Sequence, residues 1–331
     1  MATINDNKLT LIDWARRRDP DGNTDMIVEA LSENNPILQD AAVLESNLPT
    51  GHRTTIRTAL PTAQWRQLNA GVPITKSHTR QTTDAIGQLE TYSEVDKSLA
   101  DLSGDTTAFR LSEDRAHISS MGIEAARAIF YGNDDGATPE EPRGFQPRYE
   151  TLSSSQLIDG GGDSDGDQAS MWFITWGADT AHLIFPKGQM AGLQVSDKGQ
   201  ITKTTASSTV PETAQYEAYR THFKWDLGVV VRDERFVVRI ANIDTTNLIA
   251  GTDPDFPLLM IQAYNAIEQV RKGSTVIYCN RTVKTWLDYQ RQEKTNLALS
   301  LMDWAGEETL AFWGLPIRTC DALLNTENEV T

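Results

Sequence analysis

The segment Thr58–Leu102 reads TALPTAQWRQLNAGVPITKSHTRQTTDAIGQLETYSEVDKSLADL, and it is the part of the chain that decides the fold. It is rich in Thr and Gln, and it carries a basic cluster at Lys76, His78 and Arg80. No apolar stripe with a helical or strand period runs through its middle. A segment of this kind cannot build a core of its own, so we expect it to lie against another surface.

The flanks of this segment predict a two-stranded excursion. Thr54–Thr58 and Thr79–Thr83 are rich in the β-branched residue Thr, which favours strands. Pro61, Gly71 and Pro73 lie between them and are typical of turns. An isolated hairpin is only marginally stable in water. We therefore expect its stability to come from contact with something else.

One large aromatic residue lies inside the polar excursion. Trp65 stands between Gln64 and Arg66, and Trp and Arg are enriched at the energetic centres of protein interfaces. The alternative is a local packing contact under the loop. We predict that Trp65, Arg66, Lys76 and Arg80 make contacts to another subunit.

Composition limits the classes of function. The chain has 331 residues, enough for one large or two ordinary domains, and apolar residues make up 39 % of it. Its net charge is −16, from 46 acidic and 30 basic residues. Such a chain is repelled by phosphate backbones, which argues against sequence-reading nucleic-acid binding, although local basic patches could touch nucleic acid.

Cysteine usage and hydropathy predict a protein made in the cytoplasm. The two cysteines, Cys279 and Cys320, lie in apolar stretches and are expected to be buried, reduced thiols. The first residues contain neither a basic nor an apolar leader region. No apolar run approaches the roughly 20 residues that span a bilayer.

Outside the excursion, the pattern alternates between helical and strand segments. Short helical pieces in residues 1–50 predict an arm, and a helix is expected from about 112 to 131. Strands are expected at Met171–Trp176, His182–Phe185, Phe223–Arg232 and Phe236–Ile240. Helices are expected at Phe256–Val270 and from about Ser274 to Gln292, although Thr275–Asn280 could instead open as a strand. Five tryptophans in apolar runs are expected in the core: Trp172, Trp176, Trp225, Trp304 and Trp313.

No motif in the sequence predicts catalysis, a cofactor or a metal. The Asp-rich stretch Asp159–Asp167 invites a calcium interpretation, but a loop counted from Asp163 has Gln168 and Ile174 where an EF-hand needs Gly and Glu. A solvated turn is the preferred interpretation, and loose cation binding stays open. The five histidines are scattered without a pair at ligand spacing. Phosphate-binding, dinucleotide-binding and nucleophile-elbow patterns are absent from the sequence.

Four stretches carry a family resemblance: RTALPTAQWRQLNAGVP from Arg57, SEVDKSLADL from Ser93, MWFITWGADTAHLIFPKGQMAGLQ from Met171 and FWGLPIRTCDALLNTE from Phe312. They resemble the major capsid proteins of tailed double-stranded-DNA phages, especially certain short-tailed phages. The resemblance implies an α+β chain with the Hong Kong 97-like fold. Strand order within that fold stays open.

The resemblance also implies a division of the chain. Residues 1–50 would form an N-terminal arm, and 51–92 an extended β-hairpin loop. Residues 93–150 and 295–331 would form a peripheral domain with a spine helix at about 112–131. The remaining 151–294 would form an axial domain, and Leu310–Leu324 would be one strand returning to the peripheral domain.

The function implied by the resemblance is structural, not enzymatic. Copies of the chain would assemble into hexamers and pentamers of an icosahedral shell around packaged double-stranded DNA, without sequence-specific DNA contacts and without a membrane. Scaffolding, portal and cement or decoration proteins are candidate partners, and the virion, assembled in the host cytoplasm, is the expected location. Two alternatives stay open. One is another phage structural component, such as a tail or decoration protein, and the other is an enzyme whose site the sequence does not reveal.

Overall fold

The structure is a computed structural model that describes residues 35–102, 104–135, 139–204, 214–250, 255–292, 299–304 and 307–331. Most of the predicted arm at 1–50 therefore lies outside the described residues. The described chain forms two compact units. The first contains Gln88–Ala125 and Gly192–Asp226, and the second contains 35–87, Ala126–Ala191 and Leu227–Thr331.

The first unit is built on an antiparallel ribbon of two long strands, β8 (Gln194–Thr204) and β9 (Gln215–Val231), of which the last residues of β9 belong to the second unit. The strand β4 (Gly87–Asp96) pairs with the other edge of β9. Two helices, α3 (Lys97–Leu102) and α4 (Thr106–Tyr131), follow β4 in the chain. A small apolar core joins them, formed by Val95, Leu99, Ala100 and Phe109, with Tyr219 packed against it.

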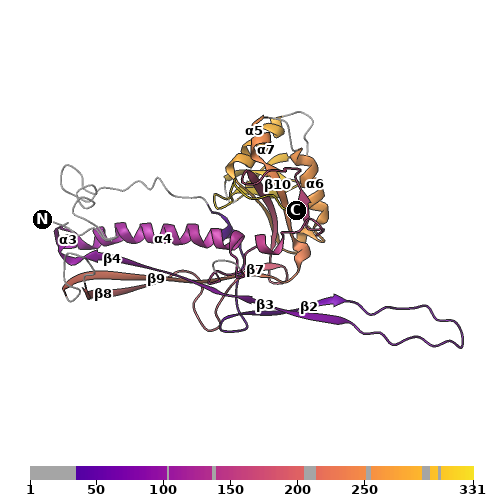
Figure 1. The fold of residues 1–331 in the computed structure, drawn as a ribbon, viewed down its shortest axis with the longest axis horizontal. Coiled ribbons are helices and arrows are strands. Elements are labelled where there is room, and N and C mark those ends of the chain that lie inside the picture. The colour runs from indigo at the N-terminus through magenta and orange to yellow at the C-terminus, as the bar shows by residue number, and fades with distance from the viewer. Residues whose placement is uncertain are drawn as a thin grey trace. The chain divides into compact units, whose positions relative to one another are not determined.

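The long helix α4 begins six residues before the predicted start at 112 (Figure 1). The carboxylate of Asp105 accepts hydrogen bonds from the backbone N–H groups of Thr107 and Ala108, which is the N-cap arrangement that starts a helix. Ser112, the predicted cap, lies inside the helix and donates its hydroxyl to the Phe109 carbonyl. The predicted end at Tyr131 is confirmed, and the Gly132 N–H still bonds to the Ala128 carbonyl.

The second unit is organised around a mixed sheet with β6 (Gln168–Trp176) inside it. Every residue of β6 is buried, which fits the continuous apolar run that predicted this strand. The strand pairs with β10, β11 and β7. The strands of this unit that belong to the sheet are β1 (Val43–Glu45), β5 (Leu157–Asp159), β6, β7 (Ala181–Phe185), β10 (Val237–Asp244), β11 (Ser274–Cys279), β12 (Leu299–Trp304), β13 (Glu307–Phe312) and β14 (Leu315–Thr319), with the end of β9 beside β7.

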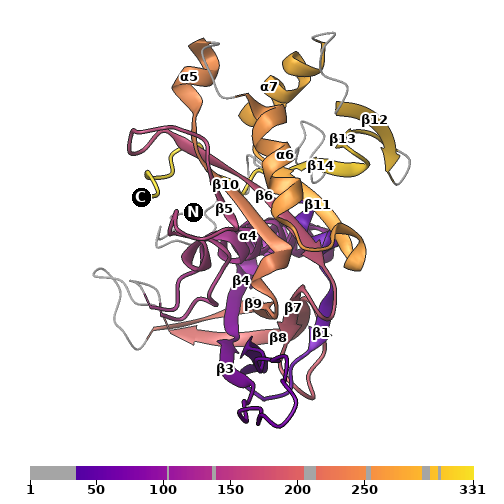
Figure 2. The same cartoon turned by 90° about the vertical axis from the view of Figure 1, so that its right-hand side faces the viewer.

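The helices of this unit are α5 (Thr245–Ala250), α6 (Phe256–Ala266) and α7 (Arg281–Gln292), together with the short α2 (Ile37–Asp40) and the single turns η1 (Gln146–Arg148), η2 (Glu234–Phe236) and η3 (Val270–Lys272). Figure 2 shows α6 and α7 near the C-terminal strands β12, β13 and β14. Of the two alternatives for Thr275–Asn280, the strand is correct. Its apolar residues are buried in β11, and the Asn280 side chain accepts the Val283 N–H and so begins α7 after the strand.

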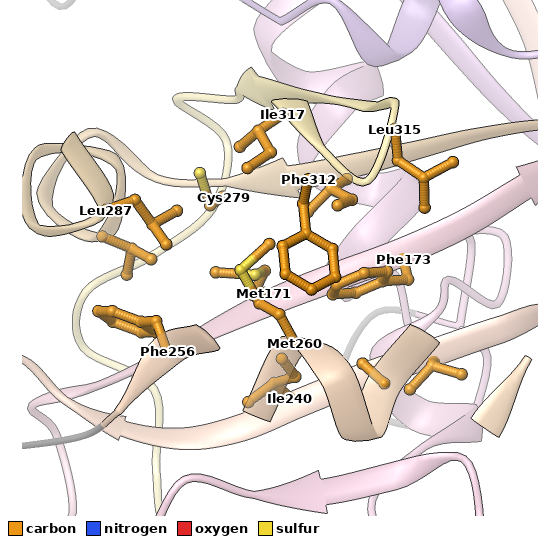
Figure 3. Packing of buried hydrophobic residues seen from close by; sticks show 14 of the residues in the cluster. Met171, Phe173, Ile240, Phe256, Met260, Cys279, Leu287, Phe312, Leu315 and Ile317 are labelled. Atoms are coloured by element: carbon orange, nitrogen blue, oxygen red, sulfur yellow. The ribbon is translucent and has the colours of Figure 1, made fainter. Parts of the chain in front are cut away.

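The large core lies between this sheet and its helices (Figure 3). Figure 3 shows Met260 from α6, Phe173 from β6 and Phe312 from β13 turned toward one another. Cys279 belongs to the same core, and both Cys279 and Cys320 are buried thiols, as predicted. None of the helices within the described ranges is long and apolar enough to cross a bilayer.

The C-terminal part differs from the prediction of one strand at Leu310–Leu324. Two antiparallel strands, β13 and β14, are joined there by Trp313–Gly314, and β14 pairs in parallel with β11. Trp313 was predicted in the core, but its side chain is 48 % exposed because it stands at the tip of this hairpin. In the described chain, β14 shares a sheet with β11, and most of β9 lies with β4. The division into arm, extended loop, peripheral domain and axial domain stays a prediction.

Candidate subunit-contact loop

The predicted two-stranded excursion is present as a ribbon of β2 (Gly51–Ala59) and β3 (His78–Ala85), which form a separate antiparallel sheet. Pairing runs from Gly51 opposite Ala85 to Arg57 opposite Thr79, and an irregularity follows before Ala59. The loop 60–77 that joins the strands extends away from the rest of its unit (Figure 1). We call β2, β3 and this loop together the contact ribbon.

The loop 60–77 exposes apolar side chains along its whole length. Trp65 is fully exposed, at 104 % of its reference surface. Isolated exposed apolar residues are common, but a dense group of them is typical of an interaction surface. The exposed apolar residues of the loop are Leu60, Trp65, Leu68, Val72 and Ile74.

Sequence reasoning found Trp65 but missed the other four apolar residues of the loop. Leu68, Val72 and Ile74 are spaced irregularly among polar residues, so they match neither the helical nor the strand period. The sequence signal that could have found them is that several apolar residues occur in a segment that Pro61, Gly71 and Pro73 mark as a loop. Their exposure became visible only with the backbone path.

The other predicted contact residues are also exposed, with one difference among them. Arg66 and Lys76 lie in the loop, whereas Arg80 lies in β3. The Arg80 guanidinium lies 3.6 Å from the carboxylate of Glu234, which belongs to the same chain. An exposed pair at this distance is weak, so Arg80 can exchange this partner for another.

A buried ion pair holds the base of the ribbon. The Asp84 carboxylate at the end of β3 lies 2.9 Å from the Arg148 guanidinium, and both side chains are largely buried. Arg148 also donates hydrogen bonds to the carbonyl oxygens of Arg143, Gly144 and Val229. Because these bonds fix the guanidinium, the end of β3 is held against the rest of its unit.

A glycine makes this close approach possible. A Cβ atom at Gly228 would lie 2.8 Å from the Ala85 carbonyl oxygen and 2.8 Å from Cγ1 of Ile184. Real Cβ contacts are not that short, so any larger residue would push β3 away from β7 and β9. Gly228 therefore positions the base of the ribbon together with Asp84.

Two histidines, which the sequence showed as unrelated, meet beside the base. The ring of His52 in β2 lies edge-on to that of His182 in β7, with 5.7 Å between their centres. Burial, then His52 and Arg232, lower the pKa of His182 to about 4, and burial also lowers the pKa of His52. Within the described ranges, no three His, Cys, Asp or Glu side chains come together as a metal site.

An open cleft of about 660 Å³ lies where β2 leaves the rest of its unit. Its size is that of a ligand pocket, the feature that would favour an enzyme. Four of its charged groups, however, are used in ion pairs, since Arg232 lies 3.3 Å from Asp179 and Arg235 lies 2.8 Å from Asp233. Hydrogen bonding from Arg235 holds the pKa of Asp233 below its usual range, which leaves it a poor general acid or base at neutral pH.

Comparison with known protein families identifies the family of this chain. The model of the family described as major capsid protein GP7 matches residues 19–331. The chain belongs to this family. It is a phage major capsid protein, a subunit of the shell, and its fold is Hong Kong 97-like. Among curated proteins, none matches.

Several solved structures are similar to this capsid protein. The chain is similar to that of Bacteriophage Epsilon15, at 35 % identity over 100 % of both chains and with a TM-score of 0.78. It is more remotely similar to the capsid protein of the native GTA particle, at 12 % identity over 66 % of this chain and 93 % of that one, with a TM-score of 0.45. An encapsulin of Synechococcus elongatus PCC 7942 is similar at 8 % identity over 71 % and 97 %, with a TM-score of 0.46.

Proposed function

We propose that copies of this capsid protein form the hexamers and pentamers of a closed icosahedral shell around the packaged double-stranded DNA, and that the contact ribbon joins neighbouring copies. The observation that carries the proposal is the row of exposed apolar side chains on loop 60–77. Covering them in the assembly removes apolar surface from water, at roughly 25 cal/mol per Å². Trp65 is the largest of them and serves as the anchor.

Charge supports a second copy as the partner of the ribbon. From Arg53 to Thr83 the chain has five basic and no acidic residues, namely Arg53, Arg57, Arg66, Lys76 and Arg80. The segment therefore carries +5 while the whole chain carries −16, so the remainder carries −21. A basic ribbon and an acidic body on identical chains are complementary, which favours and orients their contact. Arg66 and Lys76 serve this attraction at the loop, and Arg80 serves it on β3.

The remaining assignments follow the family. We assign the contact ribbon to the extended loop, α4 to the spine helix, and the sheet around β6 with α5, α6 and α7 to the axial domain; the arm, at 1–50, lies mostly outside the described residues. The protein has a structural role and no enzymatic one. Assembly takes place in the host cytoplasm, with scaffolding, portal and cement or decoration proteins as candidate partners and with DNA held without sequence-specific contacts.

The experiment is Trp65→Ala in the full chain. If the ring is an interface anchor, its loss should cost on the order of 2 kcal/mol per contact and should strongly reduce shell yield, because a shell repeats each contact many times. The unassembled subunit should melt at an unchanged temperature, because the exposed ring touches no core residue. Particle yield by sedimentation and thermal melting of the unassembled chain measure the two effects.

The matched control is Gln64→Ala, an exposed polar neighbour in the same loop, which should leave both the yield and the melting temperature unchanged. A Trp65→Ala chain that melts several degrees early and still forms normal shells would show an internal packing role instead. That result would contradict the proposal that the contact ribbon joins neighbouring copies.

A further inference from the structure

A second exposed aromatic residue, Trp313, has a strained backbone conformation. Trp313 and Gly314 are the two central residues of the tight turn between β13 and β14, and their φ values are +47° and +83°. Positive φ at both positions is the signature of a type I′ turn, which favours Asn-Gly. A bulky residue rarely adopts this conformation, since its Cβ crowds the backbone. The chain therefore keeps a tryptophan where an asparagine would be less strained.

The ring of Trp313 is only partly used inside the subunit. It stacks on Phe312, with 4.9 Å between ring centres, and meets Tyr264 of α6 edge-on at 5.0 Å. About half of its surface stays exposed. Strained backbone at an exposed residue is typical of a functional site rather than of a residue that only stabilises the fold. Trp is also among the residue types enriched at the centres of interfaces.

Two segments next to Trp313 carry no charged residue. The hairpin residues Ala311–Ile317 contain no charged side chain, and neither does the whole of α6. The helix is nevertheless partly at the surface, where Leu258, Gln262 and Asn265 are exposed. Figure 2 shows α6 at the same end of the unit as β14. We call Trp313, Tyr264 and the exposed face of α6 the uncharged patch.

We propose that the uncharged patch is a second contact between copies of this chain, distinct from the contact ribbon, with Trp313 as its anchor. This inference rests on the proposed self-assembly. Each copy carries −16, so two copies repel one another where their acidic surfaces meet. A surface without charge is where two such copies come together at least cost. The patch also lacks the cations that a nucleic acid would require.

Two substitutions separate the ring from the turn. Trp313→Asn makes the turn Asn-Gly, which relieves strain while it removes the ring, and we expect a melting temperature within a few degrees of the parent and at least a tenfold loss of shell yield. Trp313→Phe keeps an aromatic ring on the same strained backbone, and we expect it to keep most of the yield. Normal shell formation by Trp313→Asn would overturn the proposal.

Hydroxyl-radical footprinting of the unmodified chain gives an answer even where Trp313→Asn folds poorly. Oxidation of Trp313 is compared between the unassembled chain and shells that contain only this chain, with the fully buried Trp172 as an internal reference. We expect several-fold protection in the shell. Equal oxidation in both states, or protection only in particles that contain another protein, would overturn the contact between copies. Failure of the parent chain to form shells would instead contradict the proposed function.

Discussion

His182 shows at the scale of one residue how burial opposes charge. Its side chain is almost fully buried in β7, beside His52 and near Arg232. Its Nδ1 atom has no hydrogen-bond partner among the described residues. Burial is the largest of the causes that lower its pKa from 6.5 to about 4, and the positive Arg232 acts in the same direction. The imidazole is therefore neutral at physiological pH.

This shift predicts a pH-dependent stability with a definite sign. Between pH 6.5 and about 4 the unfolded chain binds a proton at this residue and the folded chain does not. The contribution of the neutral His182 side chain to the free energy of unfolding should therefore be complete above pH 6.5. That contribution should be lost as the pH is lowered toward 4. In urea unfolding of the unassembled chain between pH 6.5 and about 4, the stability of the parent should fall by on the order of 3 kcal/mol more than that of His182→Phe.

Carboxylates also titrate in this range, so the comparison between variants is the measurement. The control is His78→Phe, because His78 is exposed in β3 and its replacement should leave the slope unchanged. A His182→Phe chain with the parent's pH dependence would show that the buried imidazole takes up its proton without cost.

The C-terminal segment Cys320–Thr331 shows, at the scale of an element, how a charged side chain is buried. It has no regular strand or helix, yet Glu327 inside it is buried and lies 2.9 Å from the fully buried Arg239 of β10. The Glu327 carboxylate also accepts hydrogen bonds from the hydroxyls of Tyr131 and Ser170. The Arg239 guanidinium lies over the Trp172 ring, 5.2 Å from its centre. One side chain thus ties the end of the chain to the core.

Removal of Glu327 should be strongly destabilising. In Glu327→Ala the Arg239 charge stays buried without its partner, and breaking a buried pair in this way costs about 3–5 kcal/mol. Chemical denaturation of the unassembled chain measures the loss. Glu329→Ala is the matched control, since Glu329 is exposed two residues away and should change stability by less than about 0.5 kcal/mol. If Glu327→Ala lowered stability as little as Glu329→Ala, the buried ion pair would contribute nothing to stability.

At the scale of the whole molecule, the charge distribution bears on how strongly the protein binds DNA. The chain carries −16 overall, and the basic residues of Arg53–Thr83 are concentrated on the contact ribbon. If the ribbon is covered by a neighbouring copy, its cations are not available to DNA. On this proposal the assembled shell would offer packaged DNA few cations and would bind it weakly.

Binding to double-stranded DNA should therefore depend on assembly and on salt. At about 0.15 M salt the unassembled chain should not retard linear DNA in a gel, because few cations face the phosphates. At about 0.02 M salt the ribbon should bind weakly, and Arg66→Glu with Lys76→Glu should abolish that binding. Assembled shells should bind at neither salt concentration. Tight binding at the higher salt concentration would contradict this account of the charge.

The sequence by itself determined the elements whose causes are local. The buried strand around Trp172 follows from a continuous apolar run, and the end of α4 follows from Gly132. The contact ribbon follows from Thr-rich flanks around Pro and Gly, and the resemblance of four short stretches pointed to the family and the fold. All of these signals lie within a few residues of the feature that they specify.

Only the tertiary structure decided which distant residues meet. Asp84 reaches Arg148, and His52 reaches His182, across long stretches of chain, so no spacing in the sequence marks them. The exposure of Trp313 was predicted wrongly because an apolar run is read as core, whereas its place at the tip of a hairpin depends on the pairing of β13 with β14. Side-chain type is a local property, but burial is set by what the rest of the chain brings alongside.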